Sequence, residues 1–257
     1  VGDPLQVEPV VTIPKVLIDI LADSTCVANE YKVIENSAQT FADNINEFNG
    51  MIGERQVGCP LVVHRRCIEP MFSISNLISY DNRMFNKTNK KEEYLKPENP
   101  FLIKKSGWIN VEGVENGGKD HFVKNQAERV CQLMEDAVHI YSDLFETDDK
   151  IFIITPFRTV AESMRKFVIS HFLVKGYDKE ILSKWTKNCV GTVHTFQGKD
   201  ANEVLLVLGC SNKSVGAMNW VVKKANILNV ACTRAKYRIA SVSYTHLRAH
   251  ETDSYLV

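Results

Sequence analysis

The stretch IFIITPFRTVAESMRKFVISHFLVKG, residues 151–176, decides the fold class of this chain. It opens with a short apolar run at residues 151–155, which is typical of a strand buried on both faces. Residues 159–174 then place four apolar side chains three and four positions apart, and Gly176 follows as a helix terminator. A buried strand followed by an amphipathic helix predicts one unit of a parallel α/β sheet.

The same alternation continues towards the C-terminus. Residues 190–195 and 203–208 are predicted as strands, residues 220–231 as a helix, and residues 237–240 as the start of a last strand. Strands that alternate with helices predict a doubly wound, mostly parallel sheet flanked by helices, which is the α/β class. Ligands of such sheets bind where the strands end, so we expect the functional side chains at the carboxyl edge.

The first half of the chain carries weaker signals of secondary structure. In chain order they predict a strand end and connection at 10–20, a helix at 37–48, a strand at 61–63, a helix at 70–80, an exposed loop at 87–100, a strand at 108–111 and a helix at 123–145. The prediction at 10–20 rests on Pro14, which interrupts an apolar run.

Composition excludes several classes of protein. Of the 257 residues, 44% are hydrophobic and 24% charged, values that argue against disorder and low complexity. Lys and Arg together number 31, as do Asp and Glu, so the net charge is zero. A strongly basic nucleic-acid coat is therefore not expected, although a local basic groove is compatible with this balance. The longest apolar runs, such as residues 204–208, are too short to span a bilayer, so no membrane partner is expected.

Seven cysteines are scattered along the chain, and no two have the CxxC spacing. The odd count and irregular spacing argue against a disulfide framework or a zinc knuckle, and we expect no metal-ligating residues in this chain. Free thiols favour a reducing compartment, so the predicted location is the cytoplasm, or the nucleus in a eukaryote.

Both ends of the chain have unusual sequences. The chain begins at Val1 rather than at a methionine, which suggests that an upstream part is missing. Residues 242–252, VSYTHLRAHET, back-translate into the adaptor of transposase-based sequencing libraries, and residues 255–257 fit its continuation. We therefore expect residues 241–257 to be an artefactual tail and the chain to be a fragment; the alternative is a natural tail that matches by chance.

Five short strings lie at predicted strand–loop or loop–helix junctions. They are GDPLQ at 2–6 with Pro9, HRRC at 64–67 with Ser75 and Asn76, ITPF at 154–157, GTVHTFQGKD at 191–200 and NVACTRAK at 229–236. In order and spacing this set resembles motifs III, IV, IVa, V and VI of the superfamily 1 nucleic-acid helicases. The branch it resembles holds the nonsense-mediated-decay RNA helicase and the Okazaki-fragment helicase-nuclease, and the resemblance covers residues 2–240.

This resemblance implies a domain organisation. Members of the family have two RecA-like domains with ATP and Mg²⁺ in the cleft between them. Residues 1–22 would end the first domain, residues 23–60 would connect, and residues 61–240 would form the second domain. The chain has no GxxxxGK[ST] loop, which together with the Mg²⁺-binding acidic motif is expected in a missing N-terminal RecA-like domain. We therefore expect the chain alone not to hydrolyse ATP.

The resemblance also implies catalytic residues. Arg234 would be the arginine finger that reaches the γ-phosphate, because a guanidinium bridges two phosphate oxygens. Arg66 would contact the same phosphate, with the adjacent Arg65 as the alternative. Gln6 would sense the γ-phosphate, and Asp3 would brace its loop. Without the resemblance, the usual interpretation of a lone arginine at this position is a surface ion pair at a helix end.

Residues 197–200, QGKD, are the candidate nucleotide-binding turn. Gly198 would permit close approach of the backbone to a ligand, while Gln197 and Lys199 flank it. Asp200 stands where the family usually has a glutamate that binds the ribose hydroxyls. Aspartate is one methylene shorter, so this contact could be lost or mediated by water.

Three further residues match positions that touch nucleic acid in the family. Thr155 and Thr192 lie at predicted strand ends, where hydroxyls donate to phosphates without reading the base sequence. His194 stands where relatives often have aspartate, and a structural role for this histidine is the alternative.

The resemblance thus implies a fragment of an ATP-dependent helicase or translocase that acts on single-stranded nucleic acid, with the 5′ to 3′ direction of the branch that it resembles. The alternatives are a nucleic-acid-binding module with a decayed ATPase, or the helicase part of a larger nuclease or restriction system. The residues do not distinguish DNA from RNA.

Overall fold

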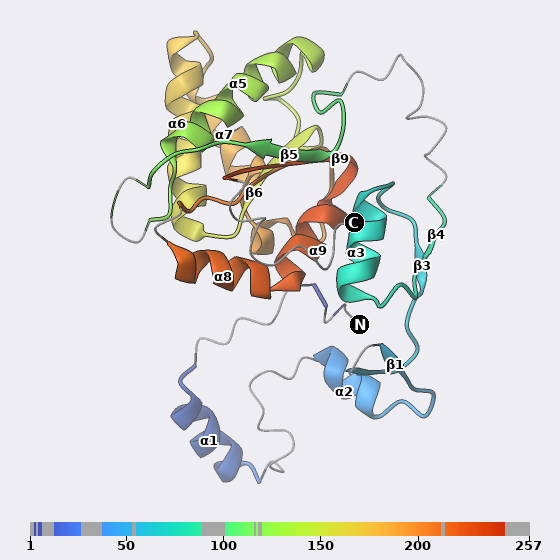
Figure 1. The fold of residues 1–257 in the computed structure, drawn as a ribbon. Helices are drawn as coiled ribbons and strands as arrows, with labels where there is room; N and C mark the ends of the chain where they lie inside the picture. Colours follow the sequence, from blue (N-terminus) through green and yellow to red (C-terminus); the bar gives the residue numbers. More distant parts are fainter. Residues whose placement is uncertain are drawn as a thin grey trace.

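The computed structural model of the chain describes residues 3, 5–6, 13–26, 38–52, 55–88, 101–115, 117, 120–211 and 214–244. Their main feature is a five-stranded sheet in the order β5-β9-β8-β6-β7, with every neighbouring pair parallel (Figure 1). The strands are β5 Gly107–Asn110, β6 Ile151–Thr155, β7 Val190–Thr192, β8 Ala201–Val207 and β9 Ala235–Ser243. The predicted α/β fold, a RecA-like parallel sheet flanked by helices, is confirmed.

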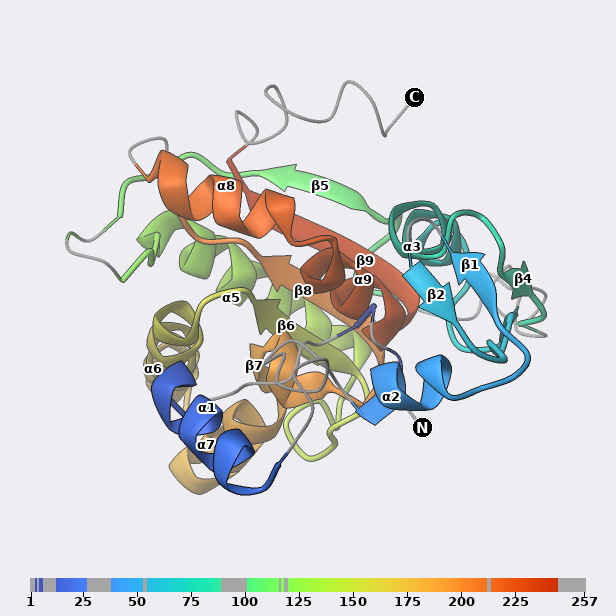
Figure 2. The same ribbon diagram turned by 90° about the horizontal axis from the view of Figure 1, so that it is seen from below.

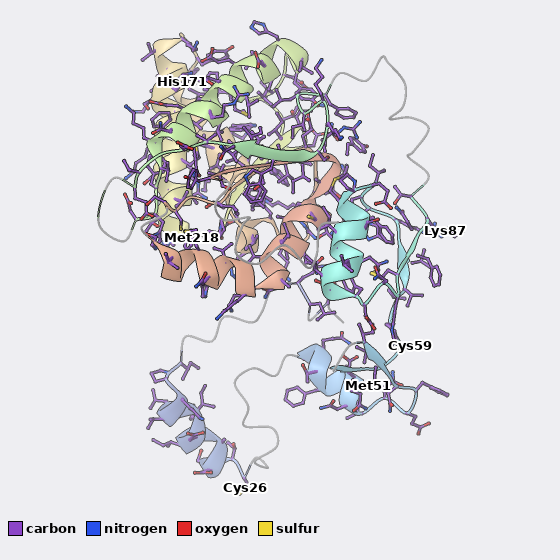
Figure 3. The ribbon with its side chains drawn as sticks, viewed as in Figure 1. Cys26, Met51, Cys59, Lys87, His171 and Met218 are labelled. Atoms are coloured by element: carbon purple, nitrogen blue, oxygen red, sulfur yellow. The ribbon has the colours of Figure 1, made fainter. Side chains whose placement is uncertain are left out.

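Helices cover both faces of the sheet. The two groups, drawn in Figures 1 and 2, are α5 Lys124–Ile140 and α6 Arg158–Val174 on one face, and α8 Val215–Lys223 and α9 Ala225–Arg234 on the other. Helix α7 (Lys179–Cys189) packs against α6, and the short 3-10 helix η2 (Val193–Phe196) follows β7. In Figure 3, His171 marks the end of α6 and Met218 marks α8, on opposite sides of the sheet. The sheet is thus wound on both faces, as right-handed crossovers require.

The first part of the chain adds small elements around this body. They are α1 Lys15–Ser24, α2 Ala38–Asn44, the antiparallel pair β1 Gly50–Ile52 and β2 Arg55–Val57, the parallel pair β3 Val63–His64 and β4 Phe85–Asn86, and α3 Met71–Ser79. Helix α3 packs against α9, whereas α1 and α2 lie below the sheet in Figure 1. None of the helices in the described ranges is long and apolar enough to cross a membrane.

The central strands are buried because helices cover both sides of them. All five residues of β6 are buried, as are all residues of β8 except Asn202. Such unbroken apolar strands are characteristic of a parallel sheet inside an α/β protein. The apolar run that decided the fold class therefore lies at the centre of the hydrophobic core.

Two helices differ from the sequence-based expectation. A helix, α1, occupies part of the segment expected as a strand end and connection, because Pro14 stands just before its first residue. A residue without an N–H costs no hydrogen bond at that position. Helix α7 was not predicted, although Asp178 accepts hydrogen bonds from the backbone N–H groups of Glu180 and Ile181, at 2.8 and 3.0 Å. This N-cap is the signal that sequence reasoning overlooked.

The end of the sheet also differs from the prediction. The helix expected at 220–231 is two helices, α8 and α9, separated at Lys224. Strand β9 continues to Ser243, and residues 241–243 are at most 9% exposed and pair with β5. The segment expected as a foreign tail thus contributes three residues to the sheet. Residues 245–257 lie outside the described residues, and the origin of this segment stays a prediction.

One carboxylate is buried between the sheet and the segment before β5. Glu203 of β8 is fully buried and accepts hydrogen bonds from the backbone N–H groups of Leu102 and Ile103, at 2.9 and 2.6 Å, and from the Tyr141 hydroxyl at 2.7 Å. Burial raises the pKa of this carboxyl, while the three donors oppose the shift. Glu203 therefore links residues 101–106 and the end of α5 to the middle of the sheet.

We expect Glu203→Ala to lower the free energy of unfolding by about 3–5 kcal/mol, because it leaves three buried donors without an acceptor. Glu203→Gln is the matched control, since one oxygen still accepts from Leu102 and Tyr141. Its expected loss is about 1–3 kcal/mol. Urea unfolding followed by circular dichroism measures both values. If Glu203→Ala were as stable as the unaltered chain, the hydrogen bonds to Glu203 would contribute nothing to the free energy of unfolding.

Candidate functional site

The quoted strings lie at two edges of the sheet rather than at the carboxyl edge alone. Thr155 and Thr192 end β6 and β7 and are paired in register, so they lie at the carboxyl edge, as predicted. Asp200 and Arg234 directly precede the first residues of β8 and β9, which makes them neighbours at the amino edge. The expectation of a single edge was wrong because α9 runs back across the sheet and ends at the amino side.

Arg234 is fully buried at the end of α9. Its Nη1 donates to the carbonyl oxygens of Phe196 and Lys199, at 3.2 and 3.0 Å. Its Nη2 donates to Gln6 Oε1 at 3.3 Å and to Thr233 Oγ1 at 3.2 Å. Its Nε has no hydrogen-bond partner among the described residues. The guanidinium is thus held entirely by neutral oxygens and retains one unused donor.

The charges around Arg234 are mostly positive. Arg66 Nε lies 4.0 Å from Asp200 Oδ2, and Lys236 Nζ lies 2.7 Å from Asp200 Oδ1. Burial, and then the charge of Arg66, lower the pKa of Arg234 to about 10, and Asp200 partly opposes the shift. Two arginines and a lysine therefore surround a single carboxylate. We call Arg66, Arg234, Lys236 and Asp200 the cation cluster.

Local structure positions Arg66 beside α9. The backbone N–H of Cys67 donates to His64 Nε2 at 2.9 Å, which closes the turn around Arg66. Burial, and then the charge of Arg66, hold the pKa of His64 below its ordinary value, so its ring nitrogen remains an acceptor. The backbone N–H of Ile68 donates to the Lys236 carbonyl at 3.1 Å. This turn therefore joins two members of the cation cluster.

The N-terminal segment reaches the same place. Gln6 Oε1 accepts from Arg234, while its Nε2 donates to Asp3 Oδ2 at 2.9 Å. The other oxygen of Asp3 accepts from the Leu5 backbone N–H at 3.0 Å. Tyr80 also donates its hydroxyl to Asp3. Asp3 thus orients Gln6 towards the arginine; Gly2, Pro4 and Pro9 of the same string lie outside the described residues.

A buried asparagine fastens this segment to the helices. Asn229 of α9 is fully buried and donates to the Leu5 carbonyl at 2.8 Å and to the Tyr80 hydroxyl at 3.2 Å. It also accepts from Ser75 Oγ of α3 at 2.5 Å. Sequence reasoning quoted Ser75 and Asn229 within motif strings without a role and missed Tyr80, since no spacing links the three.

The turn at residues 197–200 binds Arg234 through a backbone carbonyl. Gly198 has φ +84°, a conformation that favours glycine, and the turn that it forms presents the Lys199 carbonyl to the arginine. Asp200 directs its two oxygens at Lys236 and Arg66. Gln197 is exposed, and binding of a nucleotide by these residues stays a prediction.

The predicted nucleic-acid residues lie at the carboxyl edge. Thr155 is buried, and its hydroxyl accepts from the Phe157 backbone N–H at 3.4 Å. Thr192 Oγ1 lies 3.4 Å from Thr195 Oγ1 and is only half-buried. His194 is exposed and lines a shallow pocket, which is described next. Of the two threonines, Thr192 is the more accessible to a ligand.

The shallow pocket lies between the carboxyl edge and α8. Its lining includes Gln6, Pro156, His194, Trp220 and Lys224. Lys224 Nζ lies 5.8 Å from the centre of the Trp220 ring, and that ring is 44% exposed. Gln6 therefore contacts both the cation cluster and this pocket.

A family model described as an AAA domain matches residues 46–245, more than three quarters of the chain. The chain belongs to this AAA-domain family. The domain occurs in superfamily 1 helicase-like proteins, so the chain has a helicase-like P-loop NTPase domain with a RecA-like α/β fold. A search of curated proteins found no match.

P-loop NTPase families generally use a nucleotide and Mg²⁺. The residues around Arg234 are suited to the phosphates of a nucleotide but not to Mg²⁺. The cation cluster suits a phosphate, because Arg234 is buried with an unused Nε and the carboxylate of Asp200 faces the other two cations, Arg66 and Lys236. It does not suit Mg²⁺, which prefers free carboxylate oxygens. Both oxygens of Asp3 accept hydrogen bonds, and both oxygens of Asp200 face cations. Magnesium ligands are therefore not found among the described residues around the arginines.

We expect Asp200→Asn to lower the free energy of unfolding by about 1 kcal/mol at low salt, because it removes the only anion of the cation cluster. The loss shrinks at high salt, where screening weakens the repulsion among the three cations. Asp81→Asn is the matched control, since it alters an exposed pair with Arg83. Thermal unfolding at two salt concentrations measures the difference. A loss that does not depend on salt, or that Asp81→Asn shares, would contradict the charge assignment.

Proposed function

We propose that this AAA domain is the second RecA-like lobe of an ATP-dependent helicase or translocase on single-stranded nucleic acid. In this proposal Arg234 is the arginine finger, Arg66 is a second phosphate contact, and Gln6 senses the γ-phosphate. The observation that carries the proposal is the buried Arg234, bound to Gln6 and to neutral oxygens, with an unused donor. Neutral acceptors replace much of the hydration of this buried cation, and an anionic ligand would add the opposite charge that it lacks and use its free donor.

The contacts of Gln6 support a sensor role. Its amide oxygen accepts from Arg234, and its amide nitrogen donates to Asp3, which also accepts from Tyr80. A shift of the guanidinium towards a phosphate would break the bond to Gln6. Because Asn229 links Tyr80 and Leu5 to α9, the change would reach helices that border the pocket. Two alternative sets of contacts of this kind are what a nucleotide-driven switch requires.

The carboxyl edge supports the nucleic-acid part of the proposal. Thr192 and His194 offer polar groups there, and Trp220 offers an exposed ring beside Lys224. Hydroxyls and lysines bind the sugar–phosphate backbone, while exposed aromatic rings stack on bases of any identity. Binding should therefore depend on salt and only weakly on base sequence. Translocation in the 5′ to 3′ direction is proposed from the motif resemblance alone.

Hydrolysis requires groups that the chain does not contain. No GxxxxGK[ST] string occurs in the sequence, and both carboxylates near the arginines are engaged. A second lobe that carries a P-loop would hold Mg²⁺, and that ion would neutralise the charge of the phosphates. We propose that this chain alone is inactive and acts only opposite such a lobe. The second candidate, a binding module with a decayed ATPase, is favoured only by the engagement of Asp200.

We expect Arg234→Ala to reduce nucleic-acid-stimulated ATPase by about 10³–10⁵-fold in a protein that joins this chain to a P-loop lobe. Nucleotide affinity should change little, because the finger acts mainly on the transition state. Arg158→Ala is the matched control, since Arg158 is exposed and, among the described residues, its ion pair is with Glu162 along α6. Steady-state phosphate release measures both variants. Unchanged turnover in Arg234→Ala would overturn the finger assignment, and a joined protein without any ATPase would favour the decayed module.

We expect Trp220→Ala to weaken binding of a single-stranded oligonucleotide by about 5- to 150-fold, the loss of one base–aromatic stack. The dependence on salt should stay the same, because no charge is removed. Lys224→Ala should instead reduce the slope of log affinity against log salt by about 0.7, the value for one contact to a single strand. Fluorescence anisotropy at several salt concentrations measures both quantities. If Trp220→Ala binds as well as the unaltered chain, the pocket is not the nucleic-acid site.

A further inference from the structure

We propose that Glu115, His121 and Cys210 form a site for one divalent transition-metal ion of the zinc type. Each residue offers one ligand atom, a carboxylate oxygen, an imidazole nitrogen and a thiol sulfur, and these atoms lie within 4.8 Å of one another. The cation cluster, the pocket and the proposed ATPase do not use these residues. The proposal is therefore independent of the proposed function.

The three residues come from two loops that the fold brings together. Glu115 and His121 lie between β5 and α5, and Cys210 follows β8. The Cys210 backbone N–H donates to the His121 carbonyl at 2.9 Å, and Cys210 is 3% exposed. Gly209 allows this approach, because a Cβ there would lie 2.7 Å from the His121 carbonyl oxygen. The loops are thus held in contact by the backbone, and the donor atoms lie in a largely buried place.

Hydrogen bonds from Ser211 hold one oxygen of Glu115 and leave the other turned towards His121, where a bound ion would replace the contact between the two side chains. Its Oε1 accepts from the Ser211 backbone N–H at 2.7 Å and from Ser211 Oγ at 3.2 Å. Its Oε2 instead faces His121 Nδ1 at 3.3 Å. The His121 ring packs against Phe157, with ring centres 4.7 Å apart, which restricts its rotation. Such outer contacts are what fix the carboxylate and imidazole ligands of metal ions.

The backbone at two of the ligands is strained. His121 and Cys210 have φ of 55° and 61°, in the left-handed region that residues other than glycine rarely adopt. Conformations of this kind cost about 1–3 kcal/mol each and persist where surrounding structure or function requires them. Here both strained residues point their donor atoms at one place. A metal ion bound by both would offset this cost.

The donor set selects the class of ion. One sulfur, one nitrogen and one oxygen suit Zn²⁺ or Co²⁺, whereas Mg²⁺ and Ca²⁺ prefer oxygen ligands only. Three protein ligands leave a fourth tetrahedral position for water. Binding releases the Cys210 thiol proton to solvent, because the thiolate is the ligand. The ion would fasten the loop before α5 to the loop after β8, next to Phe157 and Trp220.

Titration of the purified, reduced chain with Co²⁺ tests the site. We expect one equivalent to bind with the thiolate-to-cobalt absorption band and the visible bands of a tetrahedral ion. Zinc should displace the cobalt stoichiometrically. Absence of the thiolate band, or binding only to exposed groups without it, would overturn the proposal and leave Glu115 and His121 as a hydrogen-bonded pair.

Variants assign the ligands. Cys210→Ala should abolish the thiolate band and weaken zinc affinity by more than about 100-fold. This exceeds the loss seen when a residue that only hydrogen-bonds a metal ligand is removed. Cys131→Ala is the matched control, because it removes an equally buried thiol from α5 and should bind normally. His121→Asn is a second variant, chosen in case Cys210→Ala does not fold. Asparagine tolerates the left-handed backbone conformation of residue 121, and the loss of the imidazole should also weaken zinc binding. A thiolate band that persists in Cys210→Ala or disappears in Cys131→Ala would overturn the assignment.

Discussion

The burial of one guanidinium is the constraint on which the rest of this site depends. Arg234 is fully buried and is hydrogen-bonded only to neutral oxygens, which come from η2, the following turn, α9 and the N-terminal segment. A buried cation is tolerated only where such acceptors replace its hydration. The turn around Gly198, the end of α9 and the position of Gln6 must therefore all be correct before the arginine can be accommodated.

The same constraint is the reason for proposing a functional rather than a purely structural role for Arg234. Arginines that serve stability are commonly paired with carboxylates, whereas Arg234 shares a single carboxylate, Asp200, with Arg66 and Lys236 without touching it. Burial, and then the charge of Arg66, lower the pKa of Arg234 to about 10, so the group remains charged at neutral pH but is not neutralised. An unbalanced, preorganised charge of this kind stabilises developing negative charge with little reorganisation.

The two edges of the sheet give the AAA domain two separate surfaces. The amino edge carries the cation cluster, and the carboxyl edge carries the threonines, the shallow pocket and the loops of the proposed metal site. Helix α9 spans the distance between them, and Gln6 contacts the cluster at one end and the pocket at the other. Communication between a nucleotide and a nucleic acid would therefore pass through α9 and the segment that Asn229 holds against it.

The sequence by itself determined the α/β class, because the buried run at 151–155 is a local feature. Through the motif resemblance it also pointed to Arg66, Asp200 and Arg234, but it gave no role to Lys236. It also contained the N-cap of α7 at Asp178, which was overlooked. Only the tertiary structure decided which edge each motif occupies and which distant residues meet. Cys210 reaches His121 because parallel strands return the chain to the same edge after each helix, and no spacing along the sequence encodes that return.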